Sequence, residues 1–342
     1  MNPNMAYYAL ETKIATKKGR ILQKAEWNKF LDCSDVGQFA ELLKNNVEFA
    51  KAFDGMLYEK LKREDLETAL LKFKTLQIEN LLHYLSGPYK EFIKTILMES
   101  DIRDLNLILR KITKNESLDG IEERFVHSKN YTNLAYGDLL SAGSVEQLIE
   151  KLKGTPYYNG LSNLSKEDAM KREFHIEMKM YVALYKSIFE KAEKLSKEDQ
   201  KAVKELVGFR IDLLNIQWIY RAKKYYEISP EEMFIYSLEG GLSMGYNRIK
   251  KLCYATMDEF INLSKQYLKN DFFKDANNTD INIVIDSYML NYMKKNTFNN
   301  IGTVVSFIYF LDIIIDDLMS ITEGIEYKVP REKIQEYLVQ KI

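Results

Sequence analysis

Residues that interrupt helices are scarce in this sequence, which has only 5 prolines and 15 glycines among 342 residues. Proline removes a helical hydrogen bond and glycine weakens a helix, so their scarcity favours long uninterrupted helices. No segment alternates apolar and polar residues for long enough to predict a β-sheet. The sequence therefore predicts an all-α protein, and its length allows a substantial buried core.

Histidine and cysteine, the usual ligands of zinc and the residues of redox motifs, are also few, with three histidines and two cysteines. His175 and Glu177 are close in sequence, but residues two apart on a helix point away from each other. Cys33 and Cys253 lack the spacing of a zinc or redox motif, which favours buried or idle thiols in a reducing cytoplasmic compartment. We expect neither a metal nor a cofactor.

Neither sign of charge is in excess, because the sequence has 49 basic and 50 acidic side chains. No segment is basic enough to predict nucleic-acid binding, and the N-terminus has no secretory signal. The most apolar segment, Thr303 to Ile315, is shorter than the roughly 20 residues that a bilayer span needs. It predicts a buried helix without membrane insertion. A membrane helix with an ion-binding carboxylate at Asp312 is the alternative, and it would require polar partners.

Motifs of common enzymes are missing as well. The sequence contains no GxSxG, HExxH, paired CxxC or GxGxxG. Gly240, Gly241 and Gly245 have the outer spacing of a phosphate-binding loop, but Tyr246 and Asn247 replace its lysine and hydroxyl residue. This segment predicts a turn or a helix crossing, and an enzyme of unrecognised type is the least favoured function.

Internal repeats are the most informative feature of the sequence. Three helices are expected to begin with the same pattern, in which an N-cap residue is followed three positions later by a glutamine or glutamate that reaches back to the N–H of the cap. The three pairs are Asp35 with Gln38, Ser144 with Gln147, and Thr256 with Glu259. The caps are 109 and 112 residues apart, and a leucine stands four positions before each one.

A second landmark recurs at a similar interval. The segment 101–110 (DIRDLNLILR) aligns without gaps with 212–221 (DLLNIQWIYR) and, more loosely, with 314–323 (IIDDLMSITE). Asp104, Asn215 and Asp317 thereby take equivalent positions, at 69, 71 and 61 residues after the caps. Arg110 and Arg221 are also equivalent, whereas the third segment ends in Glu323.

Amphipathic stretches between the landmarks predict long helices. They cover 66–85, 92–112, 173–195, a helix capped by Ser196, 281–294 and 301–323. Gly87 and Pro88 should end the first of these helices. Each repeat is then a cluster of short helices followed by a long antiparallel pair. We expect three helical repeats, at 1–125, 126–235 and 236–342, packed through their apolar faces into one body.

Two groups of basic residues are candidates for binding a partner. The opening segment carries two aromatic and four basic residues, Tyr7, Tyr8, Lys13, Lys17, Lys18 and Arg20, and is compatible with a solvated helix face or with a contact face. Arg110 and Arg221 could neutralise the ends of their helices or line a shared central surface.

The landmark segments resemble a known family. DIRDLNLILR, FRIDLLNIQWIYRAKKYY and FLDIIIDDLMSITEGIEY are similar to the thrice-repeated helix signature of the C/d (AC39-like) subunits of V/A-type ATPases, and YYALETKIATKKGRIL is similar to their first helix. The resemblance covers nearly the whole chain. Family third copies tend to end in Glu-Gly, which Glu323 and Gly324 match, so strict equivalence with the two arginines is not expected there.

This resemblance implies a funnel-shaped, pseudo-threefold protein without an active site. It would sit on the cytoplasmic face of the membrane rotor ring of c/K subunits and hold the shaft made by subunits D and F. It would pass torque between the ring and the ATP-handling head for proton or sodium transport. An unrelated helical-repeat adaptor is the alternative, and it predicts that only neighbouring repeats touch.

Overall fold

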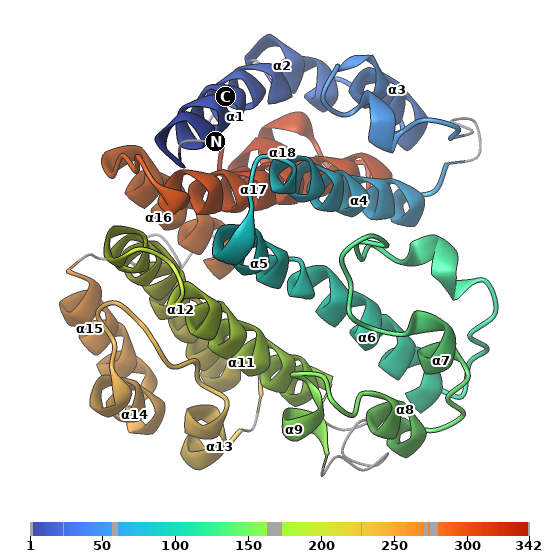
Figure 1. Cartoon of the computed structure of the whole chain (residues 1–342). Coiled ribbons are helices and arrows are strands. Elements are labelled where there is room, and N and C mark those ends of the chain that lie inside the picture. The colour runs from blue at the N-terminus through green and yellow to red at the C-terminus, as the bar shows by residue number, and fades with distance from the viewer. Residues whose placement is uncertain are drawn as a thin grey trace.

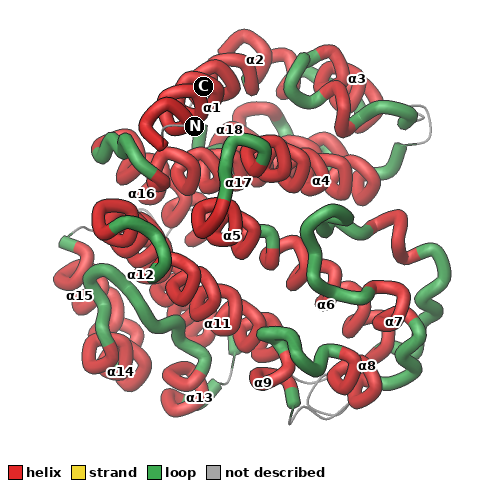
Figure 2. The backbone as a smooth tube through the Cα atoms, in the orientation of Figure 1, coloured by secondary structure: helices red, strands yellow, loops and turns green. Residues whose placement is uncertain are grey.

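The computed structural model describes residues 3–22, 24–56, 61–162, 173–226, 228–269, 273 and 280–340. Its regular elements within these ranges are all helices, with short 3₁₀ turns and no strand (Figure 2). The predicted fold class is therefore confirmed as all-α.

The molecule consists of seven long helices and a larger set of short ones within the described ranges (Figure 1). The long ones are α1 (Pro3–Ile21), α4 (Arg63–Leu82), α6 (Met98–Thr113), α11 (Glu173–Ala192), α12 (Lys197–Tyr225), α16 (Ile281–Lys295) and α17 (Ile301–Glu326). The shorter ones are α2 (Lys24–Leu31), α3 (Val36–Asn45), α5 (Gly87–Ile96), α7 (Tyr136–Leu140), α8 (Val145–Lys151), α9 (Tyr158–Leu161), α13 (Pro230–Ile235), α14 (Tyr246–Tyr254), α15 (Met257–Leu268) and α18 (Arg331–Glu336).

The three predicted N-caps begin α3, α8 and α15. Asp35, Ser144 and Thr256 each accept a hydrogen bond from the backbone N–H three residues on, which satisfies a donor that the helix leaves unpaired. The return bond differs, because only Glu259 reaches the N–H of its own cap. The glutamines of the first two pairs instead accept from the N–H of the residue before the cap. The expectation of three full capping boxes was therefore wrong for two of them.

A side chain of each landmark segment binds the chain 22 or 23 residues further on. Asp104 accepts from the N–H of Val126 at 3.0 Å, and Asp317 accepts from the N–H of Val339 at 2.7 Å. The amide of Asn215 accepts from the N–H of Leu238 at 2.8 Å and also donates to its carbonyl. All three acceptors are almost fully buried. The bond fastens the segment that leaves each long helix back onto that helix.

The predicted helix over 92–112 is divided in two. Gly87 and Pro88 do not follow a helix directly but begin α5, where proline fits the first turn because its missing N–H would be unpaired there. At Leu97 the backbone hydrogen bonds span three residues in place of the four of an α-helix. Leu97 N–H donates to the Lys94 carbonyl, and Ser100 N–H donates to the Leu97 carbonyl. No glycine or proline marks this break, so periodicity alone could not reveal it.

The long helices contact one another in a closed circuit. Helix α11 packs on α5 and α6, α12 packs on α17, and α17 packs on α4 and α1 (Figure 1). Arg331, the first residue of α18, pairs with Asp32 beyond α2. The first and last parts of the chain therefore meet directly, in addition to each touching the middle part.

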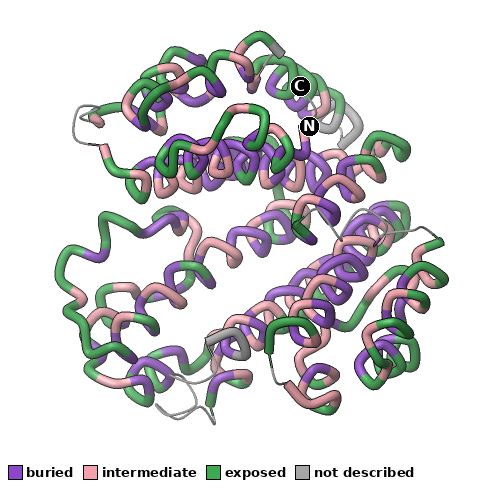
Figure 3. The backbone as a smooth tube through the Cα atoms, turned by 180° about the vertical axis from the view of Figure 1, so that it is seen from behind, coloured by how far each residue is buried: buried purple, intermediate pink, exposed green. Residues whose placement is uncertain are grey.

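Helix α17 occupies the centre of the core. Most residues between Ile301 and Ile315 are buried, as predicted for the most apolar segment, and Figure 3 colours the backbone by burial. Asp312 has the polar partner that burial requires, because Lys74 of α4 pairs with it. Among the described residues, no helix combines the length and the apolar character that crossing a membrane requires.

Candidate partner-binding site

A cavity of about 780 Å³ lies among α4, α12, α16, α17 and α18. Its lining is rich in charged and tyrosine side chains, which include Glu67, Arg210, Arg221, Asp280, Asp286, Asp316, Asp317, Glu323, Tyr327, Lys333 and Tyr337. The rings of Tyr327 and Tyr337 are exposed. Tyrosine and arginine are enriched in surfaces that bind another protein, although Asp, Glu and Lys are depleted there.

The arginines of the landmark segments have different positions. Arg221 is half-buried in the last turns of α12 and lines the cavity. Glu323, its counterpart on α17, also lines the cavity and pairs with Arg63 at 3.5 Å. Arg110 is exposed in the last turn of α6, where a cation favours the helix dipole, and is not among the cavity residues. The structure therefore brings Arg221 and Glu323 together but leaves Arg110 apart.

A buried cation connects three helices beside the cavity. The ammonium group of Lys74 on α4 pairs with Glu99 on α6 and with Asp312 on α17. Burial alone would lower the pKa of Lys74, but the two carboxylates outweigh burial and raise it. Burial raises the pKa of Asp312 to about 6 despite the nearby ammonium. The two carboxylates keep the ammonium group of Lys74 charged, so removing either carboxylate or the ammonium group would leave a costly unpaired charge in the interior.

A second ion pair links α12 to α16. Arg210 donates to Asp286 at 3.1 Å, and both side chains line the cavity. Burial raises the pKa of Asp286, while Arg210 opposes this effect. The ion pairs of Lys74 and Arg210 therefore connect α4, α6, α12, α16 and α17.

The basic residues of α1 divide into two groups. Lys13, Lys18 and Arg20 are exposed on α1. Lys17 is only 5% exposed and pairs with Glu48 at 2.9 Å, so its charge is satisfied inside the chain. Tyr8 is exposed. The side chains of Tyr7 and His175 lie outside the described residues.

The glycine-rich segment after α13 is a turn packed on α12. Gly240 has a φ of +93°, which glycine adopts without strain. A Cβ on Gly241 would collide with the Asp212 carboxylate, which accepts the N–H groups of Ser243 and Met244. The glycines thus let the turn approach the helix closely, as the sequence predicted for a turn.

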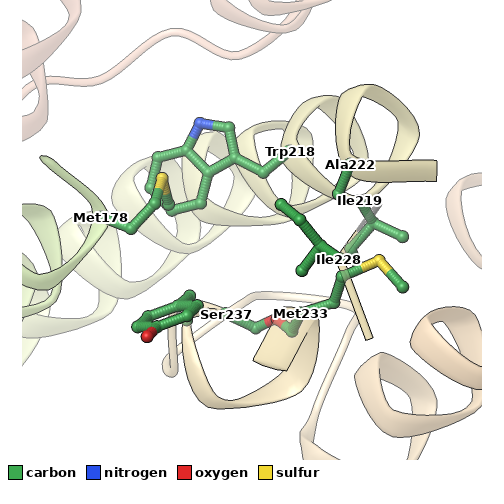
Figure 4. A pocket seen from close by; sticks show the side chains of 8 residues that line it. Met178, Trp218, Ile219, Ala222, Ile228, Met233 and Ser237 are labelled. Atoms are coloured by element: carbon green, nitrogen blue, oxygen red, sulfur yellow. The ribbon is translucent and has the colours of Figure 1, made fainter. Parts of the chain in front are cut away.

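A smaller apolar cavity, of about 20 Å³, lies between α11, α12 and α13 (Figure 4). Met178 and Trp218 point toward each other on one side of it, and Ile219, Ile228 and Met233 line it as well. Its volume suffices for about one water molecule, and its walls offer few polar partners. It is a packing gap too small for an organic ligand.

The thiols are inert in character. Cys253 is buried and Cys33 half-buried. Burial raises the pKa of each to about 11, and Asp35 and Asp32 add to the effect at Cys33. The reactive thiolate form is therefore disfavoured at neutral pH.

Sequence analysis missed Lys74, Glu99, Arg210 and Asp286. A signal was present for Arg210, which is the only cation in the largely apolar stretch 206–220, whereas Lys74 follows Lys72 by two positions. A buried charge of this kind implies a partner of opposite sign, but the partner lies on a distant helix that the sequence does not identify.

The fold and this geometry define a class of protein. It is an all-helical body in which ion pairs join the first part of the chain to the last, and it has a charged cavity that is open to solvent. Residues 10–337 match the model of the ATP synthase (C/AC39) subunit family. The chain therefore belongs to that family.

Curated relatives agree with this assignment over most of their length. The chain is 23% identical to the C subunit of the A-type ATP synthase of Archaeoglobus fulgidus over 98% of this chain and 96% of the relative. It is 24% identical to the corresponding protein of Methanosarcina barkeri over 96% and 91%, and 25% identical to that of Methanosarcina mazei over 76% and 69%.

Proposed function

We propose that the chain is the non-catalytic central-stalk subunit of a V/A-type rotary ATPase. In this role it holds the D/F shaft on one side and rests on the membrane rotor ring on the other. It transmits torque for ATP-coupled proton or sodium transport as a peripheral subunit on the cytoplasmic face. The family match over nearly the whole chain supports this role.

The proposed architecture is a funnel of three tandem helical repeats, at 1–125, 126–235 and 236–342, with pseudo-threefold symmetry. Its support is the repeated bond of Asp104, Asn215 and Asp317 to the backbone 22 or 23 residues on. Three such bonds at positions aligned by sequence are expected of copies that fold alike.

The observation that carries the proposal is the cavity bordered by helices from all three predicted repeats. Glu67 belongs to the first, Arg210 and Arg221 to the second, and α16 to α18 to the third. A socket of this kind can hold the end of a shaft without any reactive group. The exposed Lys13, Lys18 and Arg20 on α1 are the proposed second contact, with the polar loops of the ring.

Torque transmission needs stiffness, which the ion pairs between repeats supply. Lys74 with Asp312 and Arg331 with Asp32 join the first and third repeats. In the alternative, an open helical-repeat adaptor, repeats touch only their sequence neighbours. The direct contact of α17 with α4 and α1 disfavours that alternative.

Binding of a purified D/F pair tests the proposal. We expect a 1:1 complex in size-exclusion chromatography that Arg221→Glu weakens, because the cavity is the proposed socket. Failure of the wild-type chain to bind an intact D/F pair would overturn the proposed function. Equal binding by the variant would remove Arg221 from the interface.

A further inference from the structure

Three pairs of short helices, the cap pairs, share one layout. In each pair the second helix begins at one of the three N-caps, and the leucine four positions before the cap lies in the last turn of the first helix. The pairs are α2–α3, α7–α8 and α14–α15, and their leucines are Leu31, Leu140 and Leu252. The shared layout indicates that the three pairs are copies of one element.

Each cap pair packs on a long helix that carries a landmark segment. Helix α8 packs on α6, α15 packs on α12, and α3 packs on α17. The first two pairs follow their long helix along the chain, shortly after the backbone that Asp104 or Asn215 binds. The third pair comes from the opposite end of the chain. It therefore joins through tertiary contacts a unit that the other two pairs join through the chain.

Bonds from both α2 and α1 hold the N-terminal helices against the last part of the chain. Arg331 of α18 donates to the side chain of Asn28 on α2 at 2.7 Å and pairs with Asp32 just beyond α2. Helix α1 packs on α17, where the ammonium group of Lys18 lies 5.5 Å from the centre of the Phe310 ring. Two of the three N-terminal helices thus make charged contacts with α17 and α18.

We propose that α1–α3 form a closing strap, which completes the third unit from the opposite end of the chain and holds α18 in place as a wall of the cavity. The structural units are then α4–α8, α11–α15, and α16–α18 with α1–α3. This grouping keeps the three repeats of the proposed function, on which the inference rests, but assigns each cap pair to the long helix on which it packs. Its tests use the isolated chain, so their outcome is separate from that of the D/F binding experiment.

The strap also contacts the first unit. Helix α3 packs on α4, and Lys17 of α1 donates to Gln77 of α4 at 2.5 Å. The cap pair of the first unit has a similar second contact, because α8 packs on α9 and α9 packs on α11. A cap pair thus connects the long helices of one unit to those of the next. The strap makes this connection between the third unit and the first, which closes the circuit of helices.

The wall of the cavity depends on the strap through α18. Lys333, Ile334 and Tyr337 of this helix line the cavity. On one side α18 is packed tightly on α17, since a Cβ on Gly324 would collide with the side chain of Ile334. On the other side Arg331, its first residue, is bound by the strap. Loosening the strap should therefore loosen α18 as well.

Hydrogen–deuterium exchange on the isolated chain tests the bonds of the strap. In Arg331→Ala we expect the amides of α2 and α18 to exchange roughly two- to five-fold faster, because a partly exposed ion pair and one further hydrogen bond are lost. Helices α7 and α14, the equivalents of α2, should keep their wild-type exchange. Lys333→Ala, which removes an exposed cation of the same helix, is the matched control and should change neither α2 nor α18. Wild-type exchange of α2 in Arg331→Ala would overturn the proposal.

A circular permutant tests whether the strap belongs to the third unit. A flexible linker of about 20 residues, with a root-mean-square reach of about 25 Å, joins residue 342 to residue 1, and the chain is opened between Asp54 and Gly55, which are exposed. Figures 1 and 3 show both ends of the chain on the same side of the molecule. The strap is then linked to α18 and no longer to α4. We expect α2 and α3 to keep their wild-type protection from exchange.

The matched control carries the same linker but is opened between Glu116 and Ser117, which are exposed beyond α6, so that α3 stays linked to α4. Equal protection of α2 and α3 in the two permutants supports the strap. Loss of protection only in the permutant opened after Asp54 would overturn it, because α3 would then depend on its link to the first unit. If neither permutant folds, the exchange of Arg331→Ala decides, since that variant keeps the natural order of the chain.

Discussion

The buried acceptors Asp104 on α6 and Asn215 on α12 should each be specific for the segment that follows their helix, which a reciprocal exchange can test. Asp104 accepts from the N–H groups of Val126 and His127 and contacts His127 Nδ1 at 2.8 Å. Asn215 must both accept from and donate to the backbone of Leu238. We predict that Asp104→Asn and Asn215→Asp both destabilise the protein.

The magnitudes follow from which group loses its partner. In Asp104→Asn the new amide N–H₂ faces a backbone donor, which leaves a buried N–H unsatisfied and costs about 2 kcal/mol. In Asn215→Asp a carboxylate faces the carbonyl of Leu238 at a position with 0% exposure, which costs about 3–5 kcal/mol at neutral pH. Protonation restores a donor, so this second penalty should shrink as the pH falls toward 5.

Urea unfolding followed by circular dichroism measures both effects. Asp54→Asn and Asn299→Asp, at exposed positions, should change the unfolding free energy by less than about 0.5 kcal/mol. The reasoning is refuted if Asp104→Asn matches its exposed control. A penalty for Asn215→Asp that does not depend on pH would also count against it.

Three further changes separate binding from folding. Reversing Arg110 and Arg221 together should weaken assembly with the D/F pair and leave the circular dichroism spectrum unchanged; a loss of helix would point to a structural role. Lys17→Ala should cost about 2 kcal/mol in urea unfolding because it leaves the partly buried carboxylate of Glu48 unpaired, whereas the exposed Lys13→Ala should cost less than about 0.5 kcal/mol. Gly241→Ala should destabilise by about 2 kcal/mol because its Cβ collides with a carboxylate of α12, and a wild-type midpoint would contradict the close approach.

Local features of this fold were predictable from the sequence. The caps at Asp35, Ser144 and Thr256 depend on residues three positions apart, and all three form. The landmark alignment also placed Asp104, Asn215 and Asp317 in equivalent positions, and each makes the same kind of bond. Short-range chemistry and repetition carry this information without knowledge of the tertiary structure.

Long-range pairing was not predictable in the same way. The contacts of Lys74 with Asp312 and of Arg331 with Asp32 join residues far apart in the chain, and no local pattern specifies them. Lys17 illustrates the same limit. Helical spacing places it on the face of the buried Leu10, Ile14 and Ile21, but no local pattern identifies Glu48 as its partner.

Affinity isolation of the tagged chain from native membranes tests the central claim most directly. The account predicts that the D and F shaft subunits and the rotor ring are recovered with it. Their absence from the isolated material, with intact ATPase present in the same extract, would contradict a role in the central stalk.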